Sequence, residues 1–137
     1  MGFNTLDRYR DAGLLIARLG FGFGFVYFHG WPKIVGGPRA WARTGEAMAN
    51  LGVPAGYEAF GLLAGLGEGL GGLLLALGLF FRPAALWLLS VMVIATIEQY
   101  SRLMPAPEHA LKNAFLFAGL FLTGPGRFAL DAFRSRR

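Results

Sequence analysis

Residues 57–81, YEAFGLLAGLGEGLGGLLLALGLFF, form an apolar stretch that is long enough to cross a bilayer, since a membrane-spanning helix needs about 20 apolar residues. Glu68 is the one ionisable side chain within this stretch, and Glu58 lies at its edge. A charged group at mid-membrane costs about 2.5–3.5 kcal/mol by insertion scales, so it usually faces protein or water and has a partner. The many glycines of the stretch allow close helix approach in lipid. The stretch therefore predicts the packed centre of a helical bundle, with a partner for Glu68.

Three further apolar stretches give the chain its 55% hydrophobic and 15% charged residues. Such runs are typical of membrane helices rather than of a soluble core. A chain of 137 residues also fits one domain. We therefore predict a single all-α domain over residues 1–137, an integral membrane four-helix bundle. Its membrane helices are expected at about residues 11–28, 57–81, 83–100 and 107–122.

The connection between the first two helices contains HGWPKIVGGP, whose glycines and prolines are expected to end helix one at about residue 28. The first stretch contains Arg18 and has no small-residue cleavage site, so we expect it to be retained rather than removed as a signal peptide. Residues 39–50 read as a short amphipathic helix, with Trp41 and Met48 on the membrane surface. Arg82 and Pro83 are expected to form a tight turn before helix three.

Basic residues indicate the orientation of the bundle. Four crossings place both termini on one side, and more lysines and arginines fall on that side. Those on the side of the termini are Arg8, Arg10, Arg82, Arg127, Arg134, Arg136 and Arg137, against Lys33, Arg39, Arg43, Arg102 and Lys112 on the other. The bias predicts cytoplasmic termini.

Charge and cysteine content exclude several functions. Basic flanks of membrane helices account for the net charge of +5, so no nucleic-acid partner is predicted. The chain has no cysteine, which excludes thiol–disulfide chemistry, sulfur carriage and cysteine-ligated clusters within it.

Arg18 and Glu68 are the charges expected within the membrane. Each lies eleven residues from the expected outer end of its helix, His29 for the first and Tyr57 for the second. At 1.5 Å per residue both lie about 16 Å below the outer surface, so we predict an Arg18–Glu68 ion pair. An architectural pair that fixes helix register is the favoured interpretation. The alternative is the polar floor of a ligand cavity.

A second polar cluster is expected near the outer surface. Together with Arg18 and Glu68, it gives the candidate ligand-binding residues Arg18, His29, Lys33, Glu68, Glu98, His109 and Lys112. Histidine, lysine and carboxylate side chains could supply donors and proton carriers to a quinone headgroup. The alternative, which has at least equal weight, is that these are ordinary interfacial residues at helix ends. Haem is disfavoured, because the histidines are terminal rather than inside helices, and no metal site is predicted, because the ligands are too few at helical spacing.

The chain resembles the DoxX family of bacterial membrane proteins. The resemblance rests on ARLGFGFGFVYFHGWPKI, on LGVP before helix two, on EGLGGLLLALGLFFRPAA and on TGPGRFALD, which occur in family order. The family-like positions are Arg18, His29, Gly30, Lys33, Glu68, Gly71, Gly72, Arg82, Gly124, Pro125, Gly126, Arg127 and Asp131.

This resemblance implies a multi-pass protein of the bacterial inner membrane, with links to quinol oxidases, thiosulfate:quinone oxidoreductases and complexes that handle oxidative and thiol stress. The predicted function is that of a membrane subunit of a quinone-linked redox complex, which takes part in catalysis only together with a partner. Its polar pocket could hold quinone, and no covalent cofactor is implied. The alternative is a non-catalytic accessory subunit that packs against a larger complex or forms a homo-oligomer in the bilayer. A carrier is disfavoured, because transporter folds usually have paired repeats.

Overall fold

The computed structural model describes residues 7–134 and shows helices and no strand among them. The outer parts of the predicted domain, residues 1–6 and 135–137, which include Arg136 and Arg137, lie outside the described residues. The helical elements in chain order are α2 (Arg10–Gly24), η1 (Phe25–Gly30), α3 (Trp31–Val35), α4 (Gly37–Gly45), η2 (Glu46–Leu51), α5 (Tyr57–Leu77), α6 (Phe81–Ser101), α7 (Glu108–Thr123) and α8 (Leu130–Arg134). The all-helical fold class is thus confirmed for the described chain.

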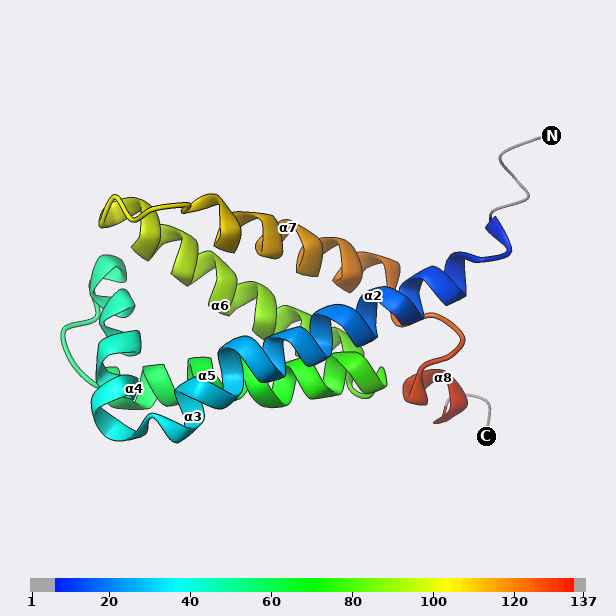
Figure 1. Ribbon diagram of the computed structural model, residues 1–137, viewed down its shortest axis with the longest axis horizontal. Helices are drawn as coiled ribbons and strands as arrows, with labels where there is room; N and C mark the ends of the chain where they lie inside the picture. The colour runs from blue at the N-terminus through cyan, green and yellow to red at the C-terminus, as the bar shows by residue number, and fades with distance from the viewer. Residues whose placement is uncertain (1–6, 135–137) are drawn as a thin grey trace.

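Three helical stretches among the described residues are long and apolar enough to cross a membrane: Arg10–Val35, Tyr57–Leu77 and Phe81–Ser101. The α7 helix agrees closely with the predicted fourth helix but has 16 residues, or about 24 Å of helix. That length is shorter than the hydrocarbon core of about 30 Å. The fold therefore contains three candidate spans and a shorter fourth helix packed beside α6 (Figure 1).

The prediction that helix one ends near residue 28 is wrong. The chain continues from α2 through the π-helix η1 into α3, so the helical stretch reaches Val35. The change of hydrogen-bond register leaves Pro32 in the first turn of α3. A proline is tolerated there because its missing N–H is not needed by the helix. Local Gly/Pro content therefore did not stop this helix.

The turn between α5 and α6 also lies earlier than expected. The α5 helix ends at Leu77 and is followed by Gly78 in a left-handed conformation, with φ of 66°, a common C-terminal cap. The α6 helix begins at Phe81, so Arg82 and Pro83 belong to its first turn rather than to the connection. Both carboxylate oxygens of Asp131 accept hydrogen bonds from the start of α6, from Phe80 N at 3.1 Å and from Phe81 N at 2.9 Å.

The region predicted as a surface helix at 39–50 is helical but divided, since α4 gives way to the 3₁₀-helix η2 after Gly45. It packs closely against the first part of α5 (Figure 1). A Cβ placed on Gly45 would lie 1.8 Å from the Tyr57 carbonyl oxygen, and one on Gly61 would lie 1.8 Å from that of Trp41. The two backbones thus meet at contacts that only glycine permits.

The interior of the bundle is formed mainly by α5, α6 and α7, with η1 against it. Its fully buried apolar side chains include Leu75, Phe81, Leu88 and Phe117. The beginning of α2 and the C-terminal segment lie at the same end of the molecule (Figure 1), where Arg127 N donates to Asp11 Oδ1 at 2.9 Å. The opposite end carries α4, η2 and the α6–α7 connection.

Candidate functional site

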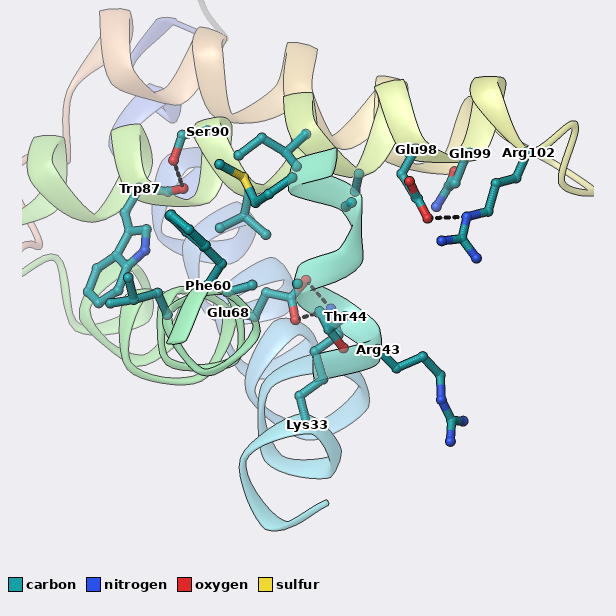
Figure 2. A pocket seen from close by; sticks show the side chains of 18 of the residues that line it. Lys33, Arg43, Thr44, Phe60, Glu68, Trp87, Ser90, Glu98, Gln99 and Arg102 are labelled. Atoms are coloured by element: carbon teal, nitrogen blue, oxygen red, sulfur yellow. Dashed lines mark hydrogen bonds and ion pairs between the residues drawn. The ribbon is translucent and has the colours of Figure 1, made fainter. Parts of the chain in front are cut away.

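A cavity of about 750 Å³ lies between the α4–η2 segment, α5 and α6 (Figure 2). Its apolar lining residues are Met48, Phe60, Leu63, Ala64, Trp87, Val91, Ile94, Ala95 and Met104, with Gly45 and Ala47 completing that part of the wall. Its polar lining residues are Lys33, Arg43, Thr44, Glu68, Ser90, Glu98, Gln99 and Arg102. Small-molecule sites typically have volumes of roughly 300–1,000 Å³, with apolar walls and a few placed polar groups. This cavity is therefore the candidate functional site.

Glu68 has its partner in this cavity, and the partner is Lys33. The Lys33 Nζ lies 2.7 Å from Glu68 Oε1 and 2.6 Å from Oε2. The Glu68 side chain is only 1% exposed, while that of Lys33 is 31% exposed. The carboxylate is thus held inside the protein and neutralised by the ammonium group of Lys33, which reaches it from α3 (Figure 2).

Three local features place Lys33 over Glu68. The π-helix η1 carries the chain onward into α3 instead of ending it. Gly30 packs directly on Gly69, where an added Cβ would lie 2.3 Å from the Gly69 Cα. From α4, the Trp41 Nε1–H donates to the Lys33 carbonyl oxygen at 2.9 Å. Single turns of π-helix inside helices are frequent at functional sites, and here one brings a lysine to a buried carboxylate.

The predicted Arg18–Glu68 ion pair is wrong. Arg18 is 1% exposed, and its guanidinium donates from Nη1 to the Pro125 carbonyl oxygen at 2.8 Å and from Nη2 to that of Phe128 at 3.1 Å. The physical reason is the position of the outer end of helix one, which the sequence placed too early. Gly30, twelve residues after Arg18, is the residue level with Glu68 and Gly69. Arg18 therefore lies about 18 Å along the helix from that level.

The predicted outer cluster is not gathered as a whole around the cavity. His29 is exposed and packs its ring on Phe25, with 4.9 Å between centroids. His109 and Lys112 are exposed at the start of α7, where Lys112 Nζ lies 3.9 Å from Glu108 Oε1. None of these three candidates lines the cavity. Of the residues predicted from sequence, only Lys33, Glu68 and Glu98 do so.

Glu98 belongs to a polar group at the end of α6. Its carboxylate contacts the Arg102 guanidinium and the Asn50 side-chain amide. Arg102 also reaches Glu46, with 3.4 Å between Nη2 and Oε2. These contacts join η2 to α6 along the cavity. The four-residue spacing of Glu98 and Arg102 was a signal that sequence reasoning could have used.

Arg43, Thr44, Trp87, Ser90 and Gln99 also line the cavity and were not predicted as site residues. The buried Gln99 Oε1 has no hydrogen-bond partner among the described residues. A buried amide oxygen without a donor is costly, so this atom is an acceptor available to a ligand. No sequence pattern distinguished it.

Potential metal ligands do not cluster among residues 7–134. No group of three or more His, Cys, Asp or Glu side chains that could hold a metal ion occurs there. The polar groups of the cavity instead comprise one buried ion pair, one arginine–carboxylate group and single donors and acceptors.

The family model DoxX matches residues 13–100. The chain belongs to the DoxX family. The matched range contains both Lys33 and Glu68 and ends before α7, so the family-like positions in residues 124–131 lie beyond it. Comparisons with curated proteins and with solved structures found no match. Family membership and the long apolar helices together indicate a membrane protein.

Proposed function

We propose that this DoxX protein is a membrane subunit of a quinone-linked redox complex and that the cavity between α4, α5 and α6 binds the quinone headgroup. The observation that carries the proposal is the ion pair of Lys33 and the fully buried Glu68 in a cavity with predominantly apolar walls. A quinone has polar oxygens and an apolar body, which match the polar ion pair and the apolar walls of the cavity.

The residues present fit such a ligand. The cavity volume of about 750 Å³ lies within the usual range for cofactor-sized ligands. Lys33 supplies N–H donors suited to a carbonyl oxygen, and the indole of Trp87 offers a flat apolar face. The Gln99 Oε1 acceptor suits the hydroxyl of a reduced headgroup.

Quinone, when bound, accepts two electrons and two protons. In this proposal Glu68 is the residue that holds or moves a proton at a carboxylate oxygen, and Lys33 keeps its charge compensated. The chain has no cysteine, and a partner protein supplies the electrons. The chain then acts as one part of an oxidoreductase.

We further propose that the protein spans the bacterial inner membrane with its termini on the cytoplasmic side and with α7 as a fourth crossing. The start of α2 and the short helix α8 lie at one end of the molecule (Figure 1), as an even number of crossings requires. The outer face of η1 and α3 exposes Tyr27 and Phe28, each 71% exposed, and Trp31 at 61%. This face favours a lipid, partner or second-copy contact, so an accessory role within a larger complex is the second candidate.

Quinone binding to the cavity can be tested by adding a short-chain quinone to the purified protein in mild detergent. Quenching of tryptophan fluorescence reports binding, because Trp87 lines the site. Lys33→Met and Glu68→Gln are expected to weaken binding at least about tenfold, which corresponds to 1.4 kcal/mol. Exposed residues on α7 and α5 provide the matched controls Lys112→Met and Glu58→Gln.

Filling the cavity gives an independent test. Ala64→Phe introduces a ring at the wall and should abolish quenching, while Ala59→Phe, at an exposed position of the same helix, should not. Quinone binding that survives both Glu68→Gln and Ala64→Phe in folded protein would refute the quinone site. Unchanged redox activity of the intact membrane complex in those variants would favour the accessory role instead.

A further inference from the structure

A second hollow lies at the opposite end of the molecule from the cavity. It has a volume of about 600 Å³ and is lined by the α5–α6 turn, the start of α6 and part of the 125–132 segment. The backbone N–H of Asp131 donates to the Gly78 carbonyl oxygen at 3.0 Å and joins the two walls. The hollow therefore lies beside the hydrogen bond that joins α8 to the α5–α6 turn.

Arginines surround this hollow. Arg82 and Arg127 line it, and Arg134 lies over the ring of Phe80, another lining residue, with 5.6 Å between Cζ and the ring centroid. All three arginines are exposed, and none makes an ion pair with another described residue. The guanidinium groups at this end are thus unpaired with carboxylates within residues 7–134.

Two described carboxylates lie at the hollow and both are already engaged: Asp131 lines it, and Asp11 Oδ1 accepts a hydrogen bond from the backbone N–H of Arg127. Asp131 uses both oxygens to accept hydrogen bonds from the backbone N–H groups of Phe80 and Phe81. It therefore holds the turn in place and makes no ion pair with the arginines among the described residues. An incoming anion would meet guanidinium groups rather than existing salt bridges.

Aromatic rings support the guanidinium groups. The Arg82 Cζ lies 5.9 Å from the centroid of Phe121, and the Arg127 Cζ lies 5.1 Å from that of Phe128. Contact with a ring face orients a guanidinium without using its N–H donors. Those donors remain available for bidentate bonds to phosphate oxygens, which the planar arginine fork matches well.

Apolar surface borders the same arginines. Phe80 is 54% exposed, Phe128 45% and Phe133 55%. A ligand held here therefore meets cationic donors beside exposed rings, the combination presented by a phosphate headgroup attached to acyl chains. Basic pockets between membrane helices bind such headgroups in other proteins.

We infer that the hollow formed by Arg82, Arg127 and Arg134 at the α5–α6 turn is a binding site for the phosphate headgroup of an anionic phospholipid. The lipid bridges α6 to the C-terminal segment and holds α8 at the bilayer surface. This site is separate from the cavity, so it is independent of the quinone proposal.

Lipid binding to the full-length protein in a zwitterionic detergent tests the inference. Native mass spectrometry is used to compare retention of phosphatidylglycerol and phosphatidylcholine. Arg82→Gln/Arg127→Gln should lose about 30-fold in phosphatidylglycerol affinity, since each basic residue near a membrane surface is worth about a factor of five. The control Arg39→Gln/Lys112→Gln removes the same charge from exposed positions at the other end and should lose less than about threefold.

Two further arms decide the nature of the ligand. Arg82→Lys/Arg127→Lys keeps the charge and should fold like the wild type, but it should lose several-fold in phosphatidylglycerol affinity because the bidentate donors are missing. Glycerol phosphate at millimolar concentration should not displace the lipid. Equal losses of phosphatidylglycerol affinity in the test and control Gln variants would overturn the site and indicate a diffuse electrostatic attraction. Efficient displacement of the lipid by glycerol phosphate would instead indicate that the ligand is a free phosphate compound.

Discussion

Lys33 and Glu68 share one ion pair but lie in different surroundings. The Glu68 side chain is 1% exposed, whereas 31% of the Lys33 side chain is accessible. If Glu68 is removed, the long lysine side chain can carry its ammonium group toward polar surroundings. If Lys33 is removed, the carboxylate remains enclosed without a cation, which is the more costly result.

Lys33→Met is therefore expected to destabilise the protein by about 3 kcal/mol and Glu68→Gln by less. Thermal unfolding in detergent measures both. Lys112→Met, at an exposed position, should change stability by no more than about 0.5 kcal/mol. A larger loss in Glu68→Gln than in Lys33→Met would contradict this asymmetry.

Arg18 stabilises the C-terminal segment rather than the cavity. Its guanidinium donates to the carbonyl oxygens of Pro125 and Phe128, and hydrogen bonds to charged groups are worth about 1.5–3 kcal/mol each. Arg18→Leu should destabilise the protein by a few kcal/mol by that measure, and trypsin should cleave more rapidly after Arg127. Proteolysis of the variant and the wild type at equal fractions of folded protein checks this.

The same geometry predicts how the stability effects of substitutions at Arg18 and Glu68 combine. Because they have separate partners, the losses in Arg18→Leu and Glu68→Gln should add within about 0.5 kcal/mol in the double variant. Lys33→Met and Glu68→Gln should instead be coupled, with the double variant less damaged than the sum. Strong coupling between Arg18 and Glu68 would show that the two sites are joined.

At the scale of elements, the approach of η1 to α5 sets the position of Lys33. Gly30 and Gly69 meet backbone to backbone. Any separation of the two helices would therefore move Lys33 away from Glu68. The glycines of α5 thus allow close helix packing, although helix propensity alone would predict that they destabilise the helix.

Gly30→Ala should destabilise the protein by about 1–3 kcal/mol, as overpacking of a tight contact typically does, and should weaken ligand binding in the cavity. Gly20→Ala is the matched control in the same helical stretch, because nothing lies within 4 Å of its added Cβ. The control should be neutral or slightly stabilising, since alanine is the better helix former. Unfolding measurements in detergent compare the two, and equal effects would argue against the close contact.

At the scale of the whole molecule, the proposed fourth crossing can be tested by labelling. The chain has no cysteine, so single cysteines can be introduced without background. Leu51→Cys and Leu103→Cys replace side chains that are 48% and 91% exposed near one end, and Phe133→Cys replaces one that is 55% exposed near the other. In oriented vesicles, an impermeant maleimide should label the first two from one side and the third from the opposite side. Labelling of all three from the same side would exclude α7 as a crossing.

The fold class and much of the helix pattern could be read from the sequence. Hydrophobic runs of membrane length are local properties, so the positions of α5, α6 and α7 were close to those observed. The ends were less predictable. The α5–α6 turn depends on Gly78 and on Asp131, which is more than fifty residues away and caps the start of α6.

The sequence by itself determined that the chain is helical, that it has membrane-length apolar stretches and that the buried Glu68 requires a partner, because burying a charge carries the same cost wherever its partner lies. Only the tertiary structure decided that the partner is Lys33. That choice depended on a π-helical continuation and on the Gly30–Gly69 contact, and both are results of packing between helices. Arg18 was likewise matched with backbone carbonyl groups of a distant segment, and since every residue carries a carbonyl, residue type alone could not have indicated them.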